Sequence, residues 1–158
     1  MKTLFLLRHA KSENATPGLT DLNRALNERG RKGAQELGQY IKRENVRFDL
    51  VLCSTAKRAR ETTESILASV ELASNVRYDQ RIHEAGPLRL LEVVSETEQS
   101  AKAVLVVGHN PALVELIQLL TGRLEPMSTC TLAKIDLDIE EWSKVPVAKG
   151  VLDWLVKV

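Results

Sequence analysis

The chain has 158 residues, a length that fits one domain and is too short for two ordinary ones. Its composition, 44% hydrophobic and 27% charged, is typical of a globular protein, and its 22 Lys and Arg residues nearly balance 21 Asp and Glu residues. A general nucleic-acid binder needs excess positive charge and aromatic stacking surfaces, but aromatic residues make up only 4% here. We therefore expect a single globular domain over residues 1–158, with room for a small phosphate site built from a few arginines.

No segment is expected to cross or anchor in a membrane. The apolar run Leu4–Leu7 ends at Arg8 and His9, well short of the apolar region of a signal peptide. No other segment approaches the ~20 apolar residues of a membrane span. The two cysteines show neither C-x-x-C nor Cys/His zinc spacing. The sequence therefore predicts a cytoplasmic protein without a disulfide framework.

The first half of the chain predicts alternating strands and helices. Leu4–Leu7 is a continuous apolar run, as expected of a strand buried on both faces. From Leu26 to Ile41, small and apolar residues recur at helical spacing. Asp49–Cys53 predicts a second buried strand, and Ser54 is a suitable N-cap for a helix over Lys57–Ser69.

The middle of the chain continues this alternation. Val76–Tyr78 predicts a short third strand, and Leu88–Val94 has the spacing of a helix. Ala103–Gly108 is the clearest strand of the chain. Asn110-Pro111 then supplies an N-cap and a proline at the first position of a helix that continues to Leu120.

The C-terminal part has a different pattern. Leu132–Ile139 and Val151–Val158 both alternate enough to predict strands, which we expect to be antiparallel at the edge of the sheet. Strand–helix alternation before them implies a parallel arrangement. The predicted fold is therefore α/β: a three-layer α/β/α sandwich with a mainly parallel sheet.

Reactive side chains follow three of the predicted strands. Arg8 and His9 follow the first, Arg58 comes soon after the second, and His109 directly follows the clearest one. In open α/β sheets the carboxyl ends of the strands line the ligand crevice. Arginine matches phosphate oxygens, and histidine can act as a nucleophile, an acid or base, or a donor. Either histidine alone is more often a plain loop residue, but their joint placement favours phosphate chemistry.

Five segments, in order, resemble the motifs of the histidine phosphatase (phosphoglycerate mutase-like) superfamily. They are Arg8–Ala10, Leu26–Gly30, Ser54–Thr62, Arg81–Ala85 and Val107–Pro111. Each is a weak pattern alone, but all five in sequence across most of the chain are specific. The resemblance implies a phosphatase activity that uses no metal or other cofactor.

The short length and the Arg-His-Ala form of the first motif resemble the SixA-type phosphohistidine phosphatase branch. The segment Asp21–Arg24 also occurs in that branch. Ala10 departs from the glycine usual in the superfamily, so roles that require glycine freedom are not carried over to it. This resemblance implies that the substrate is a phosphohistidine on a partner protein.

The resemblance also implies roles for five residues. His9 would be the nucleophile, and Arg8, Arg58 and His109 would hold the phosphoryl oxygens. Glu84 stands where the family has an acidic residue, as a proton donor to the leaving group or as a solvated carboxylate. An attacking His9 must be unprotonated, and the arginines disfavour its charged form. We expect His109 to be protonated once a dianionic group is bound, so that the two histidines have opposite preferences.

Three further residues are candidates for substrate binding: Ser12, Arg24 and Asn110. For Arg24, an ion pair with Asp21 or Glu28 is an equally good interpretation. No insertion long enough to form a cap over the site is found, which favours a substrate side chain presented by another protein.

The leading hypothesis is thus a phosphatase that forms a phosphohistidine intermediate and acts on a phosphohistidine-bearing protein. A small-molecule phosphomonoesterase and a non-catalytic phosphoprotein-binding module are the alternatives, because a fold does not guarantee activity. A zinc protein that uses His9, His83 and His109 is a further one, although these residues lack helical ligand spacing. The expected partner is a phosphohistidine-bearing protein or a small phosphorylated molecule, with neither nucleic acid nor membrane.

Overall fold

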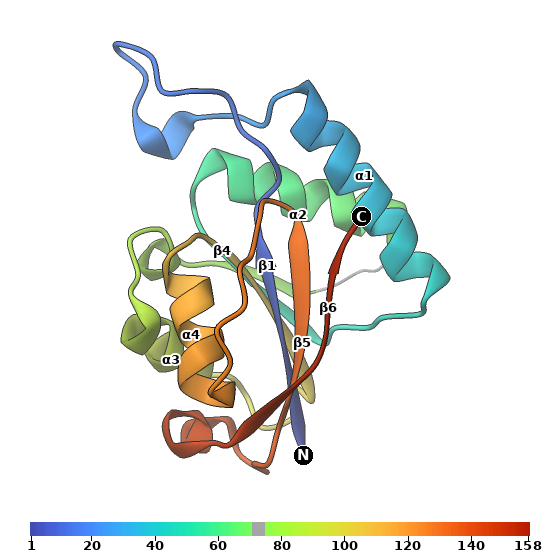
Figure 1. The fold of residues 1–158 in the computed structure, drawn as a ribbon, viewed down its shortest axis with the longest axis vertical. Coiled ribbons are helices and arrows are strands. Elements are labelled where there is room, and N and C mark those ends of the chain that lie inside the picture. Colours follow the sequence, from blue (N-terminus) through green and yellow to red (C-terminus); the bar gives the residue numbers. More distant parts are fainter. Residues whose placement is uncertain (71–74) are drawn as a thin grey trace.

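The computed structural model describes residues 1–70 and 75–158, and it has three layers (Figure 1). A central sheet lies between the helix pair α1 and α2 on one face and the pair α3 and α4 on the other. The helices are α1 (Glu28–Arg43), α2 (Lys57–Val70), α3 (Pro87–Ser95) and α4 (Ala112–Thr121). The strands are β1 (Lys2–Arg8), β2 (Leu50–Cys53), β3 (Asn75–Tyr78), β4 (Ala103–Gly108), β5 (Thr131–Leu137) and β6 (Gly150–Lys157). Short 3-10 helices, η1 (Asp21–Asn23), η2 (Gln80–Ile82) and η3 (Trp142–Val147), lie between them.

The sheet has six strands in the order β3-β2-β4-β1-β5-β6. The first four are parallel, whereas β5 pairs with β1 and β6 in antiparallel fashion. The predicted three-layer fold, the mainly parallel sheet and the antiparallel strands at its edge are therefore confirmed.

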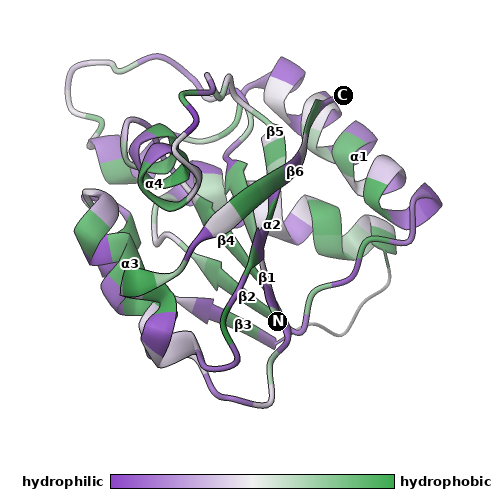
Figure 2. Ribbon diagram, turned by 60° about the horizontal axis from the view of Figure 1, so that its bottom comes forward, coloured by the Kyte–Doolittle hydropathy of each residue, from purple (hydrophilic) through white to green (hydrophobic). Residues whose placement is uncertain are grey.

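Two apolar cores, one on each face of the sheet, explain the apolar runs in the sequence. In β1, Leu4 and Leu6 pack into the core shared with α3 and α4, while Phe5 and Leu7 pack into the core shared with α1 and α2. Figure 2 shows apolar residues along both the strands and the inner sides of the helices. Because helices cover both faces, a parallel strand of this sheet reads as a continuous apolar run.

The chain reverses its winding direction between β1 and β4, which are neighbours in the sheet. After β1 the chain continues into α1 on one face, and after β4 it continues into α4 on the opposite face. Such a switch point opens a crevice at the carboxyl ends of the two strands. His9 and His109 are the first residues beyond β1 and β4, and the backbone N–H of His9 donates to Gly108 O at 3.2 Å. The topology therefore places both histidines in this crevice.

The capping of α4 differs from the prediction. The residue at the N-cap is Pro111, not Asn110, and it makes no side-chain cap hydrogen bond. The Asn110 side chain instead donates through Nδ2 to Met127 O at 2.7 Å. The expected N-cap role of Asn110 is wrong because its amide finds a partner in a distant segment.

The start of α1 packs closely against the segment that follows His9. Asn27 caps the helix by accepting from the N–H of Gly30 at 2.8 Å, and its own N–H donates to Lys11 O at 3.0 Å. A Cβ on Gly30 would lie 1.9 Å from that same Lys11 oxygen. Only glycine therefore allows this approach of helix and loop.

Among residues 1–70 and 75–158, no helix has the length and apolar character needed to cross a membrane.

Candidate active site

His9 is nearly buried, at 6% exposure, and its two ring nitrogens have different partners. Nδ1 lies 2.7 Å from Ala10 O, and because a carbonyl oxygen can only accept, the proton sits on Nδ1. Nε2 accepts a hydrogen bond from Arg58 Nε at 3.3 Å. His9 therefore presents an unprotonated Nε2 to the guanidinium of Arg58.

His109 faces His9 across the crevice, with their ring centroids 5.0 Å apart. Its Nδ1 lies 3.4 Å from Arg58 Nη2, and since a guanidinium can only donate, Nδ1 is the acceptor. Its Nε2 therefore carries the proton and donates to Ser54 Oγ at 2.8 Å. Ser54 Oγ also accepts from the N–H of Ala56 at 3.1 Å, as a cap-like residue would, but its contact with His109 was not foreseen.

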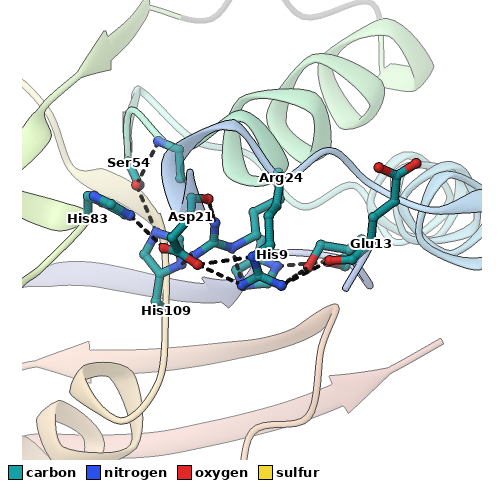
Figure 3. A network of polar contacts seen from close by, with 11 residues as sticks. His9, Glu13, Asp21, Arg24, Ser54, His83 and His109 are labelled. Carbon is teal, nitrogen blue, oxygen red and sulfur yellow. Dashed lines mark hydrogen bonds and ion pairs between the residues drawn. The ribbon is translucent and has the colours of Figure 1, made fainter. Parts of the chain in front are cut away.

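Arg58, at 5% exposure, connects the two histidines with Asp21. His9, His109 and Asp21 are labelled in Figure 3. Its Nε and Nη2 point to His9 Nε2 and His109 Nδ1, as given above. At the end of the guanidinium, Nη1 donates to Asp21 O at 2.7 Å and Nη2 to Asp21 Oδ2 at 3.1 Å. One planar group thus contacts the histidines along one edge and Asp21 along another.

Asp21 is the centre of a second set of contacts. Its Oδ2 also accepts from His83 Nε2 at 3.0 Å, and its Oδ1 accepts from Arg24 Nε at 3.0 Å. Partial burial opposes ionisation, but the hydrogen bonds from His83, Arg58 and Arg24 hold the pKa of this carboxyl well below its ordinary value. The His83 ring lies 5.5 Å from that of His109. The sequence suggested Asp21 only as an ion-pair partner of Arg24, and His83 only as a ligand in the zinc alternative.

Both crevice histidines are neutral in the unliganded site. Burial lowers the pKa of His9 to about 4, with Arg58 and Arg8 adding to the effect against the hydrogen bond to Ala10 O. Burial likewise lowers the pKa of His109 to about 3, helped by the nearby positive charge of Arg58. The expectation that the arginines disfavour a charged His9 is confirmed in direction, although burial is the larger cause. The expected protonation of His109 concerns the ligand-bound site and stays a prediction.

Two cavities adjoin at this end of the sheet. The first, of about 280 Å³, is lined by ten residues. They are Arg8, His9, Lys11, Ser12, Asn14, Arg24, Arg58, His109, Asn110 and Thr129. The second, of about 700 Å³, has Asp21, His83 and Glu84 in its wall. The bonds between Arg58 and Asp21 therefore join the walls of the two cavities.

A family model described as the histidine phosphatase superfamily, branch 1, matches residues 4–88, more than half of the chain. The chain belongs to this superfamily.

Relatives of this histidine phosphatase include an uncharacterised protein of Mycobacterium tuberculosis H37Rv, 38% identical over 106 residues, or 66% of this chain. The chain spans 63% of the length of that relative. Phosphohistidine phosphatase SixA of Escherichia coli K12 is 26% identical over 139 residues, 85% of each protein. A crystal structure from Agrobacterium tumefaciens, provisionally designated a phosphohistidine phosphatase SixA, has a TM-score of 0.86 and 26% identity, and covers 99% of this chain and 98% of that one. The predicted resemblance to the superfamily and to its SixA-type members is confirmed.

The four residues expected to carry the chemistry lie in the smaller cavity: Arg8, His9, Arg58 and His109. Among the described residues, the Arg8 side chain has one hydrogen bond, from Nη1 to Met127 O at 3.2 Å, and its buried Nε has none. An unpaired buried donor is unusual in a folded protein, so the Arg8 guanidinium, which lines the cavity, retains capacity for a further acceptor.

The candidates for substrate binding have mixed positions. Ser12, Arg24 and Asn110 line the smaller cavity, but Arg24 is held by Asp21, as the alternative interpretation proposed. Asn110 is engaged with Met127 O. Exposed Glu84 lies in the larger cavity instead, away from the group around His9.

Residues 1–70 and 75–158 contain no group of three or more His, Cys, Asp or Glu side chains placed to hold a metal ion. Although the three histidine rings lie near one another, His83 is bonded to Asp21 and His109 to Ser54.

Proposed function

We propose that this histidine phosphatase transfers a phosphoryl group to His9 Nε2 and then to water, with phosphohistidine on a partner protein as its substrate. One observation carries the proposal. The Ala10 carbonyl fixes the proton of His9 on Nδ1, so that the lone pair of Nε2 faces Arg58 in the cavity shared with Arg8 and His109. A nucleophile of this kind must be unprotonated, and burial keeps it so.

The groups around Nε2 suit the charge of the reacting group. In phosphoryl transfer, negative charge spreads over the equatorial oxygens, and catalysis is mainly positioning and electrostatic stabilisation. Arg58 offers Nε and Nη2 on the side of the histidines, and Arg8 offers further N–H donors. A bound dianion raises the pKa of His109, which would then donate to an oxygen as well.

The reaction has two steps. In the first, the Nε2 lone pair forms a bond to phosphorus while the bond from phosphorus to the ring nitrogen of the substrate histidine breaks, and the electron pair of that bond stays on the nitrogen of the departing imidazole. The Nδ1 proton stays on His9, held by the Ala10 carbonyl, and stabilises the cationic phosphorylated ring. In the second, a water oxygen bonds to phosphorus, the P–Nε2 bond breaks, and phosphate is released with the protons of the water.

Two features favour a substrate presented by another protein. The E. coli relative is a phosphohistidine phosphatase. The larger cavity of about 700 Å³ adjoins the reaction site and is lined mainly by polar and charged residues, which suits the surface of a partner better than a small apolar molecule.

Rapid quench with a ³²P-labelled substrate tests the intermediate. We expect a protein-bound label that is stable to base and labile to acid, and that is absent in His9→Ala. Arg58→Ala should slow its formation by roughly a hundredfold or more. Arg60→Ala is the matched control, because Arg60 is exposed and lies two residues away on the same helix. Phosphate release by His9→Ala at the wild-type rate would refute the mechanism.

Substrate class is tested by comparing kcat/KM for a histidine-phosphorylated protein with kcat/KM for small phosphomonoesters. The proposal expects the protein to be preferred. A preference for small esters would instead support the phosphomonoesterase alternative, and binding without turnover of either would support the binding module.

Glu84→Gln distinguishes the leaving groups. An ester oxygen needs a proton as it leaves, whereas an imidazole is a good leaving group, so loss of a general acid should reduce ester hydrolysis by about a hundredfold or more. We expect a much smaller loss on phosphohistidine, and equal losses on the two substrates would exclude Glu84 as the acid.

A further inference from the structure

The contact between Asp21 and Arg58 has a function of its own if Arg58 binds the phosphoryl group. We propose that Asp21 is a positioning residue: it holds the end of the Arg58 guanidinium so that the Nε–Nη2 edge stays turned toward the transferring phosphoryl group. This inference rests on the proposed function and assigns the residue that prepares its main arginine.

The hydrogen bonds of the Arg58 guanidinium form two sets, one to Asp21 and one to the two histidines. Asp21 takes one N–H from each terminal nitrogen, Nη1 through its backbone oxygen at 2.7 Å and Nη2 through Oδ2 at 3.1 Å. Nε and the other side of Nη2 are left to His9 Nε2 and His109 Nδ1, at 3.3 and 3.4 Å. Bonds to two neighbouring nitrogens fix the rotation of a planar group as well as its position.

Arg58 needs this support because of its environment. It is nearly buried, so N–H groups turned away from the histidines must find an acceptor inside the protein. Arginine also has a long flexible stem, and a planar fork acts on phosphate only in a defined orientation. Without the Asp21 carboxylate, Nη2 would lose one of its acceptors, and the guanidinium could turn its terminal edge toward the phosphate.

Asp21 is itself held in place. Arg24 Nε bonds to its Oδ1 at 3.0 Å, and Arg24 Nη1 in turn donates to Ser12 Oγ at 3.2 Å and Glu13 O at 3.0 Å. His83 Nε2 approaches Oδ2 from the side of the larger cavity at 3.0 Å. These bonds hold both oxygens of the carboxylate, although its side chain in the turn η1 is 57% exposed.

The same contacts could instead make Asp21 a competitor of phosphate for Arg58. The geometry argues against competition, because Asp21 contacts the end of the guanidinium and does not contact the edge that faces the two histidines. The two hypotheses predict opposite effects: loss of a positioning residue weakens anion binding, and loss of a competitor strengthens it.

A double-mutant cycle between Asp21→Ala and Arg58→Lys tests the proposal. The readouts are kcat/KM and the affinity for inorganic phosphate by calorimetry. With Arg58 present, we expect Asp21→Ala to reduce both by roughly ten- to a hundredfold, the loss typical of a hydrogen bond to a charged group. With Lys at position 58 there is no planar fork to orient, so the same change should cost about twofold or less.

Two further variants complete the test. Asp21→Asn should recover part of the loss, because its amide oxygen still accepts from Nη2. Asn23→Ala is the control, since Asn23 is exposed in the same turn η1 and should behave as wild type. Thermal unfolding of every variant shows whether the turn remains intact.

Equal losses in the two position-58 backgrounds would overturn the proposal, because they would mean that Asp21 only stabilises the turn. Tighter phosphate binding by Asp21→Ala would overturn it in favour of competition, and a wild-type protein that binds no phosphate would also overturn it. Phosphate binding requires no turnover. A wild-type protein that binds phosphate but hydrolyses no substrate would therefore refute the proposed function, while the binding cycle would still decide the role of Asp21.

Discussion

A pH titration of the ring nitrogens tests whether His9 and His109 are neutral because they are buried. The chain has only three histidines, so ¹⁵N-labelled histidine gives few NMR signals. Single His→Gln variants assign each signal to its residue. The perturbation is a change of pH from about 7.5 to about 5.5, a range in which an ordinary imidazole with a pKa near 6.5 becomes mostly protonated.

The expected size of the effect follows from the lowered pKa values. At about pH 6, an ordinary imidazole is roughly three-quarters protonated, whereas a ring with a pKa of about 4 is about 1% protonated. The His9 and His109 signals should therefore remain constant over the whole range. Their ¹⁵N shifts should also report the tautomers derived from the partners, with the proton on Nδ1 of His9 and on Nε2 of His109.

Added phosphate provides the second half of the assay. Because a bound anion favours the charged form of nearby groups, it should raise the pKa of His109. A midpoint for His9 near 6.5 in the free protein would refute the argument from burial. An unchanged His109 in saturating phosphate would refute its predicted role as a charged donor.

Three further changes have defined outcomes. Gly30→Ala would place a Cβ 1.9 Å from Lys11 O, so we expect a loss of about 1–3 kcal/mol in urea unfolding and a lower kcat; wild-type stability would mean that the loop yields freely. Ser54→Ala leaves the Nε2–H of His109 without its 2.8 Å acceptor, and should cost about 1–3 kcal/mol of stability, whereas Ser54→Thr keeps a hydroxyl and should cost less. The free energy of unfolding should fall between about pH 6.5 and 4, since the unfolded chain takes up protons there before folded His9 does. The contribution of each buried ring to this fall should be about 2–3 kcal/mol, and the fall should shrink by that amount for each of the two histidines that is replaced by Gln.

The strands were predictable because a strand that is buried on both faces has a continuous run of apolar residues. Ala103–Gly108 matches β4 in full, since a strand covered on both faces must be apolar throughout. The histidine pair was predictable for a related reason: residues that directly follow parallel strands meet at one edge of the sheet. Neither of these two predictions depends on the conformation of a loop.

The parts that depend on loops were not predictable. His83 and Asp21 are 62 residues apart, and their contact depends on how the segment after β1 folds back over the crevice. An aspartate three residues before an arginine is usually a solvated ion pair, so the pair Asp21–Arg24 gave no sign that the carboxylate also holds Arg58. The N-cap role expected of Asn110 failed similarly, because local preference was outweighed by an acceptor at Met127.

The two reactive histidines are positioned by the ends of β1 and β4, whereas the route by which a substrate reaches them is bordered by segments outside the sheet. The distance between the rings is set by the hydrogen-bonded register of neighbouring strands, in which Arg8 lies opposite Gly108. Part of the surrounding wall, namely Lys11, Ser12, Asn14 and Thr129, comes from the connections 9–20 and 122–130, which are not part of the sheet. Grafting other sequences into the outer parts of these connections, away from Lys11 and Met127, should therefore change which molecules reach His9 without moving it relative to His109. Exchange of surface segments alone would in this way adapt the same sheet and histidine pair to new phosphorylated substrates.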